Sequence, residues 1–253
     1  MAMVIGGTEW EAQYGRLSSA DRWRYVLEGV RTRLRVVAAS LLQSGRKPRE
    51  LHRVDLDRIV HPDSTFARTA VERLEGWSSP ALAHHSRRSY IWASLLGQLD
   101  GRQWDPELLF VAAMLHDLGL TERGHGCCSQ AQCFTLDAVH ASADVLAATT
   151  PERAERIRRA ILLHLNIRVP GERFGWEAHY LQAGTSLDVI GQRYRQLPQQ
   201  AVQPTLQRYP RLGLKQELGG WIRRESSLRP HSRMAMLDRL GFSGMVRAAP
   251  FDS

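Results

Sequence analysis

The sequence predicts an all-α protein with one large helical core. Apolar residues recur at three- and four-residue steps along most of the chain, and serine, threonine, aspartate or proline stands where such runs begin. No segment alternates apolar and polar residues as a half-buried strand does. The chain has 253 residues, of which 43% are hydrophobic and 24% charged, an ordinary composition for a globular protein.

Three helices are predicted in the first half of the chain. The first covers residues 19–42, and a charged stretch over 46–64 predicts a loop after it. The second follows Pro80 and runs to about Leu99, and the third begins at Pro106, which stands where a first helical turn tolerates proline. The third helix, E-L-L-F-V-A-A-M-L-H-D, is apolar on every side, so we expect it at the centre of the bundle.

The second half of the chain is also predicted to be helical. Thr150 and Pro151 form an N-cap and first turn, and a Gly- and Cys-containing loop is expected over 119–133. A Pro/Gln-rich connection over 197–204 leads to a C-terminal helical part that ends near Val246. The other helices are expected over 135–148, 151–166 and 175–195.

Charge and apolar patterning limit the partners to consider. The formal net charge is +8, and all but two of the basic residues are arginines, the exceptions being Lys47 and Lys215. The arginines are scattered and often stand near acidic residues, as on solvated helix faces, so a nucleic-acid partner is not expected. No apolar run reaches the roughly 18 residues that span a bilayer, and the first residues do not resemble a signal peptide. We therefore expect a cytoplasmic protein with no membrane partner, while association into homo-oligomers stays open.

The three cysteines lie in one segment, G-H-G-C-C-S-Q-A-Q-C, as Cys127, Cys128 and Cys133. Their odd number, without a secretion signal, predicts free thiols in a loop. A small zinc site with His125 is an alternative, although the spacing is not that of a recognised structural site. A role of these thiols in lining an active site also stays open.

A set of histidines and aspartates predicts a metal site. The adjacent pair His116-Asp117 ends the most apolar helix, His85 lies about thirty residues before it, and Asp188 lies about seventy after it. Neutral imidazoles and carboxylates that converge from separate helices suit a divalent cation. Asp188 stands among Leu, Val and Ile, where a charged group needs a metal or an arginine as partner.

The chain resembles the HD-domain superfamily of metal-dependent hydrolases, and within it the cyanamide hydratase-like branch. The resemblance covers about 80–225 and includes the P-R-L-G-L-K segment over 210–215. It implies an HD-domain helical bundle. We expect this domain over 65–225, an N-terminal helical extension and loop over 1–64 and a C-terminal helical segment over 226–253, all in one compact unit. The motifs that carry it are H-S-R-R-S-Y (85–90), L-H-D-L-G (115–119), A-I-L-L-H (160–164) and A-G-T-S-L-D-V-I-G (183–191).

The resemblance implies one divalent zinc or iron ion per chain, held by His85, His116, Asp117 and Asp188. Two-metal members carry a further histidine at a position that is Phe134 here, and Thr135 replaces a glutamate that is usual in the single-metal branch. A second metal, with His140 or His164 as extra ligand, stays an alternative, and His140 is otherwise expected in the core or beside the site.

Roles in catalysis can be assigned to several of these residues as expectations. Asp117 can orient a water molecule or accept its proton, and His164 can deliver a proton. Arg88 is expected to pair with a buried acid or, alternatively, to hold an anion. Three aromatic residues are expected to line the substrate pocket or to belong to the core: Trp92, Trp176 and Tyr180.

Four functions are compatible with this set of residues. The first is a metal-dependent hydrolase or hydratase (a hydro-lyase) that activates water for attack on a small molecule, nitrile-, cyanamide- or amide-like by analogy. The second is a nucleotide phosphohydrolase or phosphodiesterase, and the third is a diiron oxygenase. The fourth is a binding protein that keeps a metal for structure alone.

Overall fold

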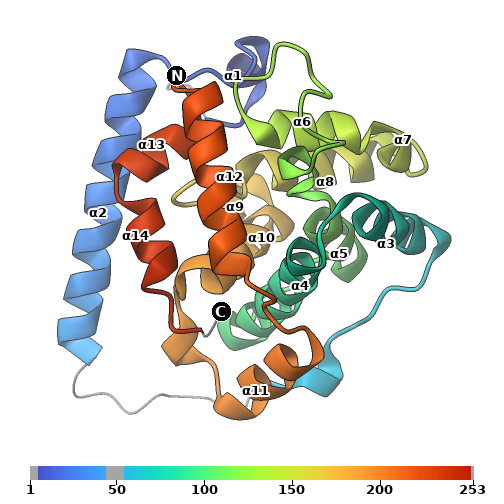
Figure 1. Ribbon diagram of the computed structural model, residues 1–253. Helices are drawn as coiled ribbons and strands as arrows, with labels where there is room; N and C mark the ends of the chain where they lie inside the picture. Colours follow the sequence, from blue (N-terminus) through green and yellow to red (C-terminus); the bar gives the residue numbers. More distant parts are fainter. Residues whose placement is uncertain (1–4, 44–53, 252–253) are drawn as a thin grey trace.

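The computed structural model describes the backbone of residues 5–43 and 54–251, and the side chains of residues 5–32 and 54–251. Every regular element in these ranges is a helix, which confirms the predicted all-α class (Figure 1). The longer helices are α2 (Ser19–Gln43), α3 (Thr65–Trp77), α4 (Pro80–Asp100), α5 (Pro106–Leu115), α8 (Pro151–Leu163), α10 (Trp176–Ile190), α11 (Gln199–Arg208) and α12 (Leu214–Leu228). The shorter ones are α1 (Thr8–Ala12), α6 (Phe134–Ala141), α7 (Ala143–Leu146), α9 (Gly171–Phe174), α13 (Arg233–Arg239), α14 (Phe242–Arg247), η2 (Leu56–Arg58), η3 (Leu118–Leu120) and η4 (Tyr194–Gln196).

Helices α4, α5 and α10 form the centre of the bundle (Figure 1). All side chains of α5 from Leu108 to Leu115 are buried, as its uniformly apolar sequence predicts. Helix α10 can approach α4 closely because it presents Gly184 to it. A Cβ atom at this position would lie 2.3 Å from the backbone oxygen of Ser89, so no larger residue fits.

Local capping residues set the ends of several helices, and Thr150 was identified as one of them from the sequence. Ser79 accepts a hydrogen bond from the backbone of Leu82 and Pro80 follows it, so α4 begins there. Thr150 caps α8 in the same way. The left-handed Gly191 ends α10 at Ile190, several residues before the predicted end of this helix.

Other segments differ from the prediction. The Pro/Gln-rich stretch over 197–204 was expected to be a connection, but α11 begins at Gln199, because Pro198 caps it and Ala201 and Val202 are buried under it. The helix predicted over 135–148 is interrupted at Ser142, which separates α6 from α7. The prediction assigned no element to α3, which Ser64 caps. The loop predicted over 46–64 lies in part outside the described residues, and its described part contains η2.

Helices from both ends of the chain cover one side of the central bundle. In Figure 1, α2 lies at the edge of the molecule, next to α13 and α14, and α12 runs between these helices and α4. One apolar cluster includes Trp10 near the N-terminus and Phe251 near the C-terminus, so the terminal segments share the core of the central helices. Within the described residues, no helix is long and apolar enough to cross a membrane.

Candidate metal centre

The site is built where α5 ends. His116 still has helical backbone angles, whereas Asp117 leaves the helix with φ −106° and ψ 10°. This change allows two adjacent side chains, which would diverge by about 100° on a continuous helix, to reach the same point. Gly119 follows, and a Cβ atom there would lie 2.0 Å from the backbone oxygen of Phe134. The glycine therefore allows the turn after α5 to contact α6.

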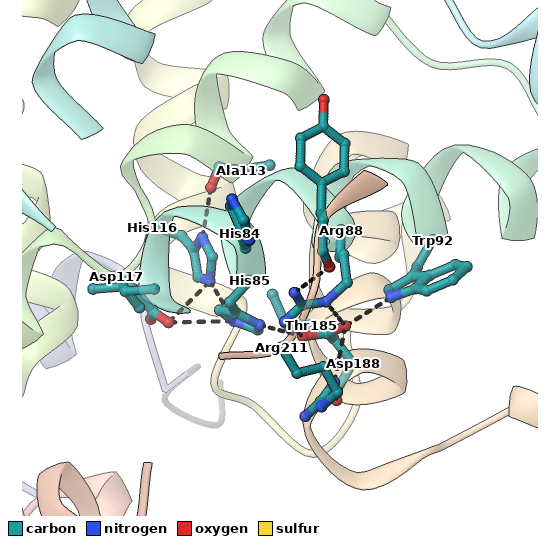
Figure 2. A network of polar contacts seen from close by, with 12 residues as sticks. His84, His85, Arg88, Trp92, Ala113, His116, Asp117, Thr185, Asp188 and Arg211 are labelled. Carbon is teal, nitrogen blue, oxygen red and sulfur yellow. Dashed lines mark hydrogen bonds and ion pairs between the residues drawn. The ribbon is translucent and has the colours of Figure 1, made fainter. Parts of the chain in front are cut away.

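Three buried residues bring their ligand atoms together (Figure 2). Oδ2 of Asp117 lies 3.2 Å from Nε2 of His116 and 3.4 Å from Nε2 of His85. The two Nε2 atoms are 3.3 Å apart. His85 comes from α4 and the other two residues from the end of α5, so the centre joins the two helices at the core of the bundle.

The hydrogen bonds of the two rings define which nitrogen can bind a cation. Nδ1 of His85 lies 2.7 Å from Oδ2 of Asp188, and Nδ1 of His116 lies 2.8 Å from the carbonyl oxygen of Ala113. These oxygens only accept, so each Nδ1 carries the hydrogen and each Nε2 presents its lone pair to the centre. Two lone pairs and a carboxylate at such short distances repel one another unless a cation lies among them. The donor set therefore fits a divalent metal ion.

His164 approaches the same carboxylate from the end of α8. Its Nε2 atom lies 3.4 Å from Oδ1 of Asp117, and its Nδ1 atom donates to the carbonyl oxygen of Ile161 at 2.6 Å. Asp117 thus faces His85 and His116 with one oxygen and His164 with the other. The structure places His164 at the site, as the sequence analysis expected.

The charges at the centre shift the pKa values of its members. Burial alone raises the pKa of the Asp117 carboxyl, but His116, His164 and His85 outweigh it and hold this pKa well below the usual range. Burial lowers the pKa of His85, yet the neighbouring carboxylates of Asp117 and Asp188 outweigh it and raise this pKa above the usual value. Burial lowers the pKa of His164 to about 4, against the opposing effect of Asp117. His164 is therefore neutral near pH 7.

Asp188 does not occupy the place that the sequence analysis assigned to it. Its carboxylate lies behind His85, on the Nδ1 side of the ring (Figure 2). The guanidinium of Arg88 donates to both of its oxygens at 2.8 and 2.9 Å, and Trp92 Nε1 donates to Oδ1 at 2.8 Å. Arg211 lies 3.4 Å from Oδ1. Asp188 thus lies where it can orient the candidate ligand His85, and its own two oxygens are taken up by Arg88 and Trp92 of α4.

The second-metal alternative does not fit the place of His140. This side chain is exposed on α6, whereas the members of the centre are buried, so His140 is neither a ligand nor the core residue that was expected. Phe134, which stands where two-metal relatives were expected to carry a histidine, is buried with its ring 5.7 Å from that of His164.

The centre forms one wall of a cavity of about 460 Å³. Each of its four members, His85, His116, Asp117 and His164, lines this cavity. The described residues that line the cavity do not include any cysteine or any of the four residues that were expected as possible pocket walls, Arg88, Trp92, Trp176 and Tyr180. Arg88 and Trp92 bind Asp188, Tyr180 is buried beside Trp104, and Trp176 stacks on Tyr180. Arg88 thus pairs with a buried acid, as expected, Trp92 and Tyr180 are buried, and Trp176 is partly buried against the core. The three cysteines are free thiols, as predicted.

Sequence reasoning missed the residues that close the cavity. They lie on α2, α12, α13 and α14. These helices lie outside residues 80–225, the segment that carries the motifs, or at its end. The apolar face of each helix is the sequence signal that could have indicated them. Arg211 was also missed as a partner of Asp188, although its segment had been noted. The chain matches no protein-family model and no curated protein.

Proposed function

We propose that this protein is a metal-dependent hydrolase or hydratase that activates water for attack on a small-molecule substrate. The observation that carries the proposal is the convergence of the Nε2 atoms of His85, His116 and His164 on the carboxylate of Asp117 at the wall of a cavity. A bound zinc or iron ion would lower the pKa of water and polarise the substrate.

The protein groups have separate roles in this proposal. His85, His116 and Oδ2 of Asp117 would hold the ion. Oδ1 of Asp117 and Nε2 of His164 are 3.4 Å apart, and both are hydrogen-bond acceptors. A water molecule that donates one hydrogen to each of them would be held in a fixed orientation. Either acceptor can take a proton from this water, and His164 can return the proton to a leaving group.

The resemblance to HD-domain hydrolases of the cyanamide hydratase-like branch supports the same reaction class by analogy. A nucleotide phosphohydrolase is less well supported, because neither arginine nor lysine is found among the described residues that line the cavity. A diiron oxygenase is less well supported too, since the described residues offer one buried group of three ligands and His140 stands away from it.

Metal analysis of the purified protein tests the proposal. We expect one zinc or iron ion per chain in the wild type and loss of this ion in His116→Ala. His84→Ala is the matched control, because His84 precedes His85 on α4 but binds the carbonyl oxygen of Pro210, away from the centre. Full metal occupancy in His116→Ala would show that the ligand assignment is wrong.

A screen for turnover completes the test. Wild-type protein loaded with metal should hydrate or hydrolyse members of a panel of nitriles and amides, and His116→Ala should lose this activity. If the loaded protein instead releases phosphate from nucleotides offered in a parallel assay, or consumes oxygen, the second or third function of the sequence analysis applies. If it binds metal and turns over none of these compounds, the metal serves structure alone.

A further inference from the structure

We propose that the cavity beside the metal centre selects an uncharged substrate with a large apolar body, and that α2, α13 and α14 determine this specificity. The inference rests on the proposed function, since it names the substrate class of the same site. It goes beyond the analogy with cyanamide, a small polar molecule, because of the size and the lining of the cavity.

The first argument is the character of the walls. Beyond the metal centre the cavity is lined mainly by aliphatic, methionine and phenylalanine side chains, such as Leu218, Met234, Leu237, Phe242 and Met245. Its volume of about 460 Å³ lies within the range of pockets that enclose an organic molecule of medium size. Burial of an apolar body against such walls is the main source of affinity that they offer.

The second argument is that several polar side chains in the walls already have protein partners. Asn166 donates to the carbonyl oxygen of Ile5 and accepts from Arg233. Gln182 donates to Ser186 Oγ at 3.0 Å, and the hydroxyl of Thr185 donates to the backbone oxygen of Gln182. These groups are engaged within the protein, so they add little attraction for a polar ligand. The hydroxyl of Thr32 is the exception, a single buried wall group without a hydrogen-bond partner among the described residues that line the cavity.

The third argument is electrostatic. The chain carries a formal net charge of +8, yet the described lining residues include no arginine, lysine or glutamate, and Asp117 is their one carboxylate. A charged group on the body of a substrate would lose its hydration without gaining a partner of opposite charge. The polar reacting group therefore belongs at the metal centre and the uncharged body against α2, α13 and α14.

Gly29 on α2 gives access to this cavity for a test. A Cβ atom at Gly29 would lie 3.6 Å from Cδ1 of Ile167 and 3.6 Å from Cδ1 of Leu240, two residues of the cavity wall. The contacts are ordinary in length, so a leucine at this position extends into the cavity and occupies part of it. Gly76→Leu is the matched control, because Gly76 lies inside α3 and its Cβ position has no neighbour within 4 Å.

Binding is measured without turnover, by the fluorescence of the neutral dye N-phenyl-1-naphthylamine and its displacement by competitors. The full chain is used with and without metal. We expect octanamide to displace the dye at a concentration at least about thirtyfold below that of acetamide, because of its longer apolar chain. The same chain with a terminal carboxylate, 8-amino-8-oxooctanoate, should be at least about tenfold weaker than octanamide. Gly29→Leu should weaken dye binding at least about tenfold, and Gly76→Leu should not.

Equal displacement by octanamide, acetamide and the carboxylate would overturn the inference, as would equal dye binding by Gly29→Leu and the wild type. The competitor series needs no variant, so it decides the matter even if Gly29→Leu does not fold. Its failure is distinct from failure of the proposed function. Binding of neutral long-chain compounds without any turnover would support the inferred substrate class and show that the proposed reaction is wrong. Turnover of charged or very small compounds alone would support the proposed reaction and overturn the inferred substrate class.

Discussion

Nδ1 of His85 lies 2.7 Å from a carboxylate oxygen of Asp188, and this contact turns the opposite nitrogen of the ring toward Asp117. The hydrogen bond crosses from α4 to α10, the two helices that Gly184 allows to pack closely. Asp188 therefore acts on the metal centre through His85. Its own charge is balanced by Arg88, whose hydrogen bonds, with those of His85, hold the pKa of Asp188 well below its usual range although burial opposes this.

Removal of the Asp188 charge should affect both stability and metal binding. Asp188→Asn leaves the guanidinium of Arg88 buried without its counter-charge, so we expect the free energy of unfolding to fall by about 3–5 kcal/mol. The weaker acceptor for His85 should lower metal affinity roughly 10- to 100-fold. Urea unfolding and a metal titration measure the two effects. Asp100→Asn is the control, since it loses a partly exposed pair with Arg193 and should cost about 1 kcal/mol or less. Unchanged metal affinity in Asp188→Asn would contradict the orienting role.

His164 should matter more for turnover than for metal retention. It faces the Asp117 oxygen that points away from His85 and His116, so we expect His164→Gln to keep its metal. Its turnover number should fall roughly 10²- to 10⁴-fold, the usual contribution of a proton-transferring group. Metal analysis and steady-state kinetics on the same preparation of His164→Gln measure metal retention and turnover separately. Loss of the ion from His164→Gln would make His164 a ligand instead.

His140 should be dispensable for metal binding. Because the side chain is exposed on α6, we expect His140→Ala to keep the metal content and the stability of the wild type. Metal content per chain, measured beside the wild type, decides between the one-metal and two-metal interpretations. A fall in bound metal in this variant would favour the two-metal enzyme.

A buried charged group near the cysteine loop should contribute to stability alone. Arg229 binds Asp137 at 2.5 Å and Glu225 at 3.2 Å, and all three side chains are buried. Arg229→Met leaves two buried acids without their cation, so the free energy of unfolding should fall by about 3 kcal/mol or more, with the metal content unchanged. Arg193→Met, at a partly exposed pair, is the control and should cost about 1 kcal/mol or less.

The loss in Arg229→Met should depend on pH. Burial already raises the pKa of Glu225 in the wild type, although Arg229 opposes it. Without Arg229 the folded-state pKa rises further above the unfolded value, so folding favours the protonated acid. The variant should therefore be least impaired near pH 4 and should lose stability as the pH rises above the unfolded pKa. A deficit that grows toward acid pH would contradict this account.

The sequence by itself determined the helical class, the central place of the apolar α5 and three of the residues that the structure brings together, His85, His116 and Asp117. Periodicity, caps and the His116-Asp117 pair are local signals, and His85 and His164 stand on helices whose apolar faces must turn inward. These features depend on the residues within one helix and on the need to bury them.

Only the tertiary structure decided how these side chains meet. The carboxylate of Asp188 lies on the Nδ1 side of His85 and away from the three candidate ligand atoms. It accepts hydrogen bonds from Arg88 and Trp92, because α10 packs on α4 at these residues. His140 lies on the exposed face of α6, and α11 formed within a stretch whose composition predicts a connection. The cavity was not predictable either, since its walls come from α2, α13 and α14. Contacts between distant helices depend on the angles and distances at which the helices pack, and no local pattern specifies these.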